Sequence, residues 1–114
     1  MEVTFKGSPV RISGSLPRLG IQAPDFVLID KDLKKCSLKD YSGKRKLISI
    51  VPSLDTAVCS LSAKKFNQAI KANPQEGVVL NVSADLPFAQ SRFCHAEQVD
   101  TIICLSMMGS KDFA

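Results

Sequence analysis

Residues 46–59 read KLISIVPSLDTAVC, and this stretch decides the fold. It opens with a continuous apolar run, residues 46–51, closed by Pro52, which is typical of a buried central strand in a parallel sheet. A helix is then expected over about residues 57–72, because polar capping residues precede an apolar pattern at helical spacing. The stretch therefore predicts a strand, a short loop and a helix whose first turn contains Cys59.

The predicted helix over residues 57–72 has one apolar face. Asp55 or Thr56 can cap its first turn, and Asn73-Pro74 ends it. The side chains that recur at helical spacing on the face toward the sheet are Cys59, Ala63, Phe66 and Ile70.

The alternation of strands and helices continues toward the C-terminus. Residues 77–83 and 101–105 read as buried strands, and a helix is expected between them over about residues 85–98. Apolar strands that alternate with helices predict a parallel α/β sheet. Residues 110–114 begin a further element that has no room to finish.

Toward the N-terminus the sequence predicts shorter elements. Residues 3–5 and 10–12 alternate around Gly7-Ser8-Pro9, which indicates a small β-hairpin. An irregular connector, a short apolar strand and a helical turn follow over residues 13–24, 26–29 and 37–41. One domain, residues 1–114, accounts for the whole chain.

Composition excludes several classes of function. With 45% hydrophobic and 23% charged residues the chain is expected to fold, and no apolar run approaches the roughly 20 residues that span a bilayer. The start, residues 1–6, lacks the order of a signal peptide, so we expect a cytoplasmic protein. The net charge of +4 is scattered, and with no Trp and one Tyr there is no stacking platform for nucleic acid. We therefore expect neither a nucleic-acid nor a membrane partner.

Four cysteines remain to be explained: Cys36, Cys59, Cys94 and Cys104. No C-x-x-C motif occurs, and the adjacent pair Cys94-His95 rarely fits one tetrahedral metal site. A structural disulfide is disfavoured in a cytosolic chain. The cysteines are therefore either inert buried thiols or include one or two reactive thiols.

Cys59 is the strongest candidate for a reactive thiol. In a first helical turn a sulfur faces free backbone amides and the positive end of the helix dipole, and both favour the thiolate. Thr56, three residues earlier, can direct its hydroxyl at the same sulfur. A buried thiol that packs with Phe66 against the sheet explains the position equally well. The position of Cys59 alone therefore does not decide between a reactive thiol and a buried thiol of the core.

A family resemblance favours the reactive reading. The run Pro52-x-x-x-Thr56-x-x-Cys59 resembles the peroxidatic motif of peroxiredoxins, and residues 23–28 resemble an early strand of that family. Residues 83–94, SADLPFAQSRFC, are similar to a stretch close to diagnostic of the thiol peroxidase subfamily, an atypical 2-Cys group with an N-terminal hairpin. The resemblance covers all 114 residues and implies a thioredoxin-like fold.

The resemblance implies a role for four residues. Cys59 matches the peroxidatic cysteine and Cys94 the resolving cysteine, while Thr56 matches the threonine that binds the peroxide and Pro52 the proline that shields the sulfur. Cys59 would be oxidised by a hydroperoxide to sulfenic acid and then form an intramolecular disulfide with Cys94. Since the two cysteines are expected on different helices, one or both helix ends must unwind locally. Thioredoxin as reductant and a homodimer are also implied, with no metal, haem or flavin.

The other cysteines and one histidine match no functional position. Cys104 lies in an apolar strand and is expected to belong to the core, whereas Cys36 lies in a polar stretch and is expected to be incidental. His95 stands where the subfamily usually has glycine, and nothing in the sequence explains the change.

The resemblance also implies that the chain lacks a C-terminal part. Family members continue for roughly fifty residues, with two strands, a last helix and an arginine that binds the peroxide. We therefore expect a sheet that is incomplete at the C-terminus and exposes the faces of Val78–Val82 and Ile102–Leu105. The alternative function is a non-catalytic thioredoxin-fold interaction module or an inactive fragment.

Overall fold

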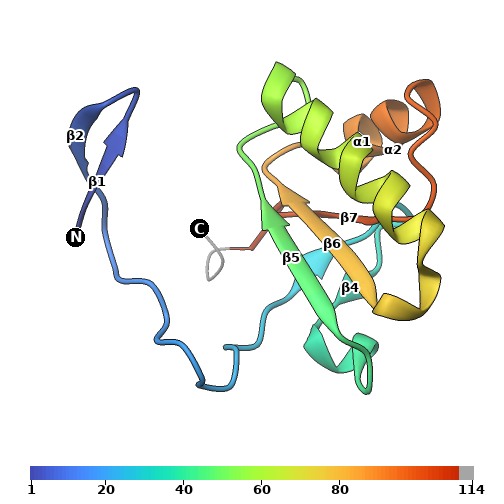
Figure 1. The fold of residues 1–114 in the computed structure, drawn as a ribbon, viewed down its shortest axis with the longest axis horizontal. Coiled ribbons are helices and arrows are strands. Elements are labelled where there is room, and N and C mark those ends of the chain that lie inside the picture. Colours follow the sequence, from blue (N-terminus) through green and yellow to red (C-terminus); the bar gives the residue numbers. More distant parts are fainter. Residues whose placement is uncertain (111–114) are drawn as a thin grey trace.

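A computed structural model of the chain describes residues 1–110 and consists of a five-stranded sheet, two α-helices and a separate hairpin (Figure 1). Both helices lie next to each other on the same side of the sheet. The strands are β1 (Glu2–Phe5), β2 (Ser8–Arg11), β3 (Leu28–Ile29), β4 (Lys35–Cys36), β5 (Lys46–Ile50), β6 (Val78–Ser83) and β7 (Ile103–Ser106). The helices are α1 (Ala57–Ala72) and α2 (Pro87–Ala96), with 3-10 turns η1 (Leu38–Tyr41) and η2 (Pro74–Glu76).

The sheet has the strand order β4-β3-β7-β6-β5. The pairs β5–β6 and β6–β7 are parallel, which confirms the predicted parallel core, whereas β3 is antiparallel to both β4 and β7. The prediction that residues 46–51 form a central strand is wrong for the described residues, because β5 lies at the sheet edge with Leu47 and Ile50 44% and 62% exposed. The local pattern of apolar residues does not encode the order of strands in a sheet.

Two apolar clusters pack on the two faces of the sheet. On the helix face, Ala63 of α1 is fully buried, and Phe66 and Ile70 pack against the same cluster. This confirms the predicted apolar face of α1 at these three positions, whereas Cys59 is not part of the cluster. On the opposite face Leu80 and Leu105 are fully buried. The remaining buried members of the two clusters are Leu54, Val79, Val99 and Ile102 on the helix face, and Phe26, Leu28 and Val82 on the other.

The predicted exposure of the β6 and β7 faces is wrong. Val79, Leu80, Val82, Ile102 and Leu105 are all buried, because β6 and β7 occupy interior positions of the sheet and are covered on both faces. In the part of the chain that the structure describes, the edge strands are β4 and β5 instead.

The N-terminal hairpin is confirmed, but its turn is displaced. Lys6 and Gly7 form the turn, with φ of 51° and 82°, and Pro9 lies within β2. Two consecutive residues at positive φ match the right-handed twist of the flanking strands, and glycine adopts this conformation readily. All residues of β1 and β2 are exposed, and Figure 1 shows the hairpin away from the five-stranded sheet.

Other boundaries differ by a few residues. The predicted strand over residues 26–29 is paired only at Leu28 and Ile29, and α2 ends at Ala96 rather than near Gln98. The helical turn near Tyr41 is confirmed as η1, whereas β4 was not predicted. The element expected to begin at residue 110 falls on residues 111–114, which lie outside the described residues.

Candidate functional site

Cys59 lies in the first turn of α1, directly after the loop that leaves β5. Thr56 is the N-cap residue by its extended backbone, and Ser60 N donates the first helical hydrogen bond to Thr56 O at 2.9 Å. The amides of residues 57–59 precede that bond and therefore have no acceptor within the helix. The side chain of Thr56, the N-cap residue, makes no capping hydrogen bond to them. The half-buried Cys59 sulfur thus lies where a negative charge is favoured.

Thr56 and Pro52 lie in the same loop, just before the helix turn that contains Cys59. The Thr56 hydroxyl donates to Ser53 O at 2.9 Å, and the Thr56 amide also approaches that oxygen, at 3.3 Å. The hydroxyl has one hydrogen, so it must rotate away from Ser53 before it can donate to a ligand at Cys59. Pro52 is exposed, and its carbonyl accepts a hydrogen bond from Ala84 N at 3.4 Å.

Asp85, in the loop after the neighbouring strand β6, fixes the Cys59 loop. Its carboxylate accepts hydrogen bonds from Ser53 Oγ at 2.6 Å, from Leu54 N at 2.8 Å and from Ser83 Oγ at 2.8 Å. Partial burial acts to raise the pKa of Asp85, but the hydrogen bonds from Leu54, Ser53 and Ser83 outweigh it and hold the pKa below its ordinary value. The ionised carboxylate therefore joins the loop after β5 to the loop after β6.

The same network continues into α2 and β7. Gln90 Nε2 donates to Ser83 Oγ and to Leu105 O, both at 2.9 Å, and Ser106 Oγ donates to the backbone oxygen of Asp85 at 2.6 Å. Gln90 is 2% exposed, so these bonds are shielded from water. Sequence reasoning missed Ser53, Asp85 and Gln90 as supporting residues, although the last two lie in the matched stretch over residues 83–94.

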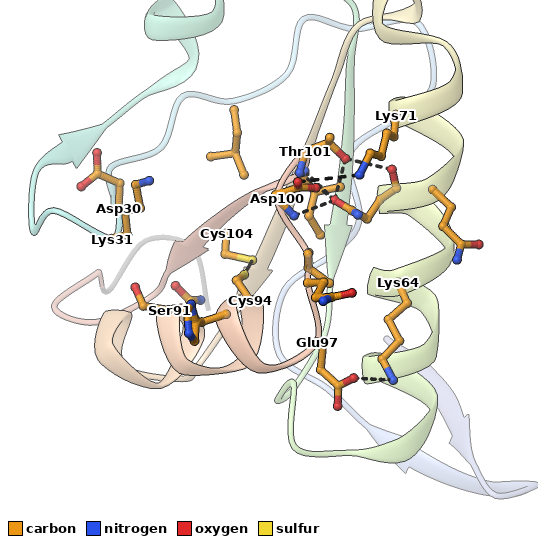
Figure 2. A pocket seen from close by; sticks show the side chains of 18 of the residues that line it. Asp30, Lys31, Lys64, Lys71, Ser91, Cys94, Glu97, Asp100, Thr101 and Cys104 are labelled. Atoms are coloured by element: carbon orange, nitrogen blue, oxygen red, sulfur yellow. Dashed lines mark hydrogen bonds and ion pairs between the residues drawn. The ribbon is translucent and has the colours of Figure 1, made fainter.

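Cys94 lies near the C-terminal end of α2 and contacts Cys104 of β7. The two sulfur atoms are 3.4 Å apart (Figure 2). The hydrogen bond with Cys104 lowers the pKa of Cys94 against the opposing effect of burial, and the positive charge of Lys31 lowers it further. The same hydrogen bond, together with burial, raises the pKa of Cys104. Of the two thiols, Cys94 therefore ionises more readily than Cys104.

This cysteine pair lines an open cavity of about 1180 Å³ (Figure 2). Lys31 and Asp30 border the cavity on one side, and residues of α1, such as Lys64, border it on another. Cys59, Thr56 and Pro52 do not line it. The structure therefore groups Pro52, Thr56 and Cys59 in one loop and helix turn, and places Cys94 apart from them, against Cys104.

Cys36 lies on the opposite face of the sheet, packed against the cluster that contains Leu28 and Leu80. Burial raises the pKa of Cys36, and the neighbouring carboxylate of Asp30, 3.6 Å from the sulfur, acts in the same direction. It therefore remains a neutral thiol. His95 is exposed.

Residues 1–110 contain neither a metal-binding cluster nor a membrane-spanning helix. No group of three or more His, Cys, Asp or Glu side chains there is arranged to hold a metal ion. In the same part of the chain, neither helix is long and apolar enough to cross a membrane.

The sheet, the two helices on one face and the cysteine in the first helical turn after a strand define a thioredoxin-like fold of the peroxiredoxin type. Residues 18–114 match the Redoxin family, and the chain therefore belongs to that family. Solved structures similar to this chain include the following two. The peroxiredoxin-like protein from Aquifex aeolicus has a TM-score of 0.79 and 38% identity, with 92% of this chain and 61% of that chain covered. Thiol peroxidase from Chromobacterium violaceum has a TM-score of 0.84 and 24% identity, with 98% and 65% covered.

Curated relatives carry the name thiol peroxidase. The protein of that name from Staphylococcus aureus strain Mu50 is 50% identical over 105 residues, which span 92% of this chain and 63% of the relative. The one from Staphylococcus epidermidis is 46% identical over the same coverage. The chain thus spans about 63% of the length of the curated relatives it matches.

Proposed function

We propose that the protein is a thiol-dependent peroxidase that reduces hydrogen peroxide and organic hydroperoxides with Cys59. The observation that carries this proposal is the position of Cys59 at the amino end of α1, beside amides that the N-cap side chain of Thr56 does not cap. Membership of the Redoxin family and 50% identity to thiol peroxidases support it.

In the proposed first step the Cys59 thiolate attacks the terminal oxygen of the hydroperoxide. The oxygen–oxygen bond breaks, water or an alcohol leaves after protonation, and Cys59 becomes a sulfenic acid. The free amides at the start of α1 stabilise the attacking thiolate. Thr56 turns its hydroxyl from Ser53 O to the bound peroxide, and Pro52 limits the access of water to the sulfur.

In the proposed second step the Cys94 thiolate attacks the Cys59 sulfenic acid, expels hydroxide and forms an intramolecular disulfide. The lowered pKa of Cys94 favours this step, because a larger fraction of Cys94 is ionised at neutral pH. Since Cys94 packs against Cys104 and not against Cys59, the end of α2 must unwind first.

The remaining parts of the proposal concern partners and setting. A thioredoxin-type dithiol would reduce the disulfide, because two thiols are needed to restore both cysteines. We further propose that the protein functions as a homodimer of a single thioredoxin-like domain in the cytoplasm, where its cysteines remain reduced.

Activity of the cysteine variants tests this proposal. Cys59→Ser is expected to abolish hydroperoxide consumption in the presence of thioredoxin and its reductase. Cys94→Ser should retain a single turnover and leave a sulfenic acid on Cys59 that a dimedone probe traps. Cys36→Ser is the matched control and should retain activity, because Cys36 lies on the other face of the sheet.

Two outcomes would contradict the proposal. Activity that survives Cys59→Ser, or is lost in Cys36→Ser, would show that the nucleophile is another residue. A folded wild-type protein that consumes no hydroperoxide would favour a non-catalytic interaction module.

A further inference from the structure

The structure pairs Cys94 with Cys104, a cysteine for which the peroxidase scheme has no use. The 3.4 Å between the two sulfur atoms is a direct contact between an α2 side chain and a β7 side chain. A disulfide needs the sulfurs to approach to about 2.05 Å, so a small rotation about the side-chain bonds closes the gap. Contact of this kind between two free cysteines makes them a dithiol pair.

Ordered elements hold this pair on both sides. Cys104 lies in β7, in parallel register with Asn81 of β6, and its neighbour Leu105 is fully buried. On the other side, Cys94 O accepts a hydrogen bond from Val99 N at 2.9 Å, and Gln90 ties α2 to Leu105 O. The contact therefore follows from the packing of α2 on the sheet.

We propose that Cys94 and Cys104 form a second disulfide, which takes over the bond first made between Cys59 and Cys94. This inference rests on the proposed function for the source of the first disulfide. Cys104 sulfur attacks Cys94 sulfur, the Cys59–Cys94 bond breaks, and Cys59 leaves as the thiolate. The proton of Cys104 goes to solvent or to Cys59. The exchange converts one disulfide and one thiol into another disulfide and thiol, so it needs no further oxidant.

The packing of α2 gives this exchange its direction. A bond to Cys59 holds the end of α2 away from β7, and the buried contacts of Phe93 and Cys94 with the helix-face cluster are then lost. A bond to Cys104 restores those contacts, because these two sulfurs already touch in the folded protein. The free energy of refolding α2 therefore favours the Cys94–Cys104 disulfide over the Cys59–Cys94 disulfide.

Two surrounding features suit a redox-active pair. Asn81 is 2% exposed and next to Cys104 in the sheet, and its side-chain amide has no hydrogen-bond partner among the described residues, so it is free to donate to a neighbouring sulfur. The pair also opens on the cavity bordered by Lys31, which leaves Cys94 within reach of an external dithiol. The consequence is that Cys59 is released for a second turnover before any reductant arrives.

Peptide mapping distinguishes the two disulfides. Trypsin places Cys59 in residues 47–64, and both Cys94 and Cys104 in residues 93–111. A Cys59–Cys94 disulfide therefore joins two peptides, whereas a Cys94–Cys104 disulfide closes one peptide on itself with the loss of two hydrogens. After a pulse of hydrogen peroxide and alkylation of free thiols, the joined peptides should appear first and decay into the closed peptide, with Cys59 alkylated. Joined peptides that persist without the closed form overturn the proposal.

A second measurement tests whether Cys94 and Cys104 can form a disulfide when the peroxidase reaction is absent. In Cys59→Ser, the thiol oxidant diamide should close the 93–111 peptide, because the two sulfurs are in contact. Cys36 supplies the matched control, since its peptide, residues 36–39, should stay alkylated. If diamide leaves Cys94 and Cys104 as free thiols in folded protein, the pair does not exist. If diamide closes the pair but peroxide never oxidises Cys59 in wild type, the proposed function fails instead.

Peroxide stoichiometry provides a third readout. Without reductant, wild type should consume about two equivalents of peroxide per chain and finish with an oxidised Cys59, whereas Cys104→Ser should consume about one and keep Cys59 in its disulfide. Cys104→Ala repeats the test without a buried hydroxyl, and Cys36→Ser should behave as wild type. Equal consumption by wild type and both folded Cys104 variants overturns the proposal.

Discussion

The carboxylate of Asp85 accepts a hydrogen bond from the backbone amide of Leu54, 31 residues earlier in the chain, at 2.8 Å. Leu54 lies in the loop after β5 and Asp85 in the loop after β6, so the bond joins the ends of two adjacent parallel strands. Ser53 adds a second bond to the same carboxylate. The path of the chain into the first turn of α1, and hence the position of Cys59, depends on this charge.

The first prediction is that Asp85→Asn destabilises the fold and slows peroxide reduction. The amide group presents a donor where the carboxylate accepts bonds from Ser53, Leu54 and Ser83, so one donor is left unpaired. We expect the free energy of unfolding, measured with urea, to fall by about 1.5–3 kcal/mol. The ratio kcat/KM should fall as well, because the Cys59 loop is less well fixed.

Asp55→Asn is the matched control for that prediction. Asp55 is an exposed carboxylate in the same loop, so its loss should change the free energy of unfolding by no more than about 0.5 kcal/mol. Equal effects of the two substitutions would show that loss of charge, and not the hydrogen bonds to Asp85, is responsible.

The second prediction concerns pH. Because the pKa of Asp85 is lower in the folded protein than in the unfolded chain, its contribution to stability is complete above the unfolded pKa. That contribution is lost as the pH falls through the folded pKa. The difference in unfolding free energy between wild type and Asp85→Asn should therefore be constant near neutrality and shrink below about pH 4. Asp30, whose pKa is also lowered, titrates in both proteins and cancels from the difference. A difference that grows on acidification would contradict this assignment.

The sequence was a good guide to what is local. Helix α1 begins and ends at the predicted residues, because caps and helical periodicity are properties of adjacent positions. The strand after Pro74 was predicted from its own apolar run. The parallel pairing of β5, β6 and β7 was predicted from the alternation of strands and helices along the chain. In the candidate site, the helix-turn position of Cys59 followed directly from the pattern over residues 46–59.

Strand order and contacts between residues far apart in the chain could not be predicted from local sequence patterns. The edge position of β5 depends on strand order, and β4 is a two-residue pairing with β3 that leaves no periodic signal. The contact between Cys94 and Cys104 depends on how α2 packs over β7. Cys104 was predicted as a core residue only, since apolar neighbours indicate burial but not which sulfur is nearby.

The third prediction concerns Asn67, a buried residue of α1 that organises the turn before β7. Its side-chain oxygen accepts bonds from the amides of Asp100 at 3.0 Å, Thr101 at 2.7 Å and Ile102 at 3.3 Å. In Asn67→Ala these amides, of which that of Ile102 is buried, lose their acceptor, and we expect the free energy of unfolding to fall by about 1–3 kcal/mol. Gln68→Ala, at the next and exposed position, is the control and should be nearly neutral. Similar urea midpoints for the two variants would refute this role.

The fourth prediction concerns Gly77, which has φ of +136° just before β6. A methyl group at this position would overlap the backbone oxygen of Arg45, the acceptor for Val78 N at 2.9 Å. Gly77→Ala should therefore lower the free energy of unfolding by about 2–4 kcal/mol. Gly43→Ala tests backbone strain alone, because Gly43 has φ of +78° with open space around it, and should lower it by about 1 kcal/mol. Thermal melts of both variants check the difference.

The last prediction concerns the Thr56 hydroxyl. In the structure it donates to Ser53 O, yet the proposed mechanism needs it to turn to the peroxide bound at Cys59. Thr56→Val removes the donor and keeps the shape of the side chain, so kcat/KM for hydrogen peroxide should fall by about 10²–10³-fold, the usual effect of losing one donor to a developing charge. Thr56→Ser keeps a hydroxyl that can rotate and should retain most of the activity. Thr56 is exposed, so both variants should melt close to wild type. Full activity in a folded Thr56→Val protein would show that the hydroxyl serves only the turn at Ser53.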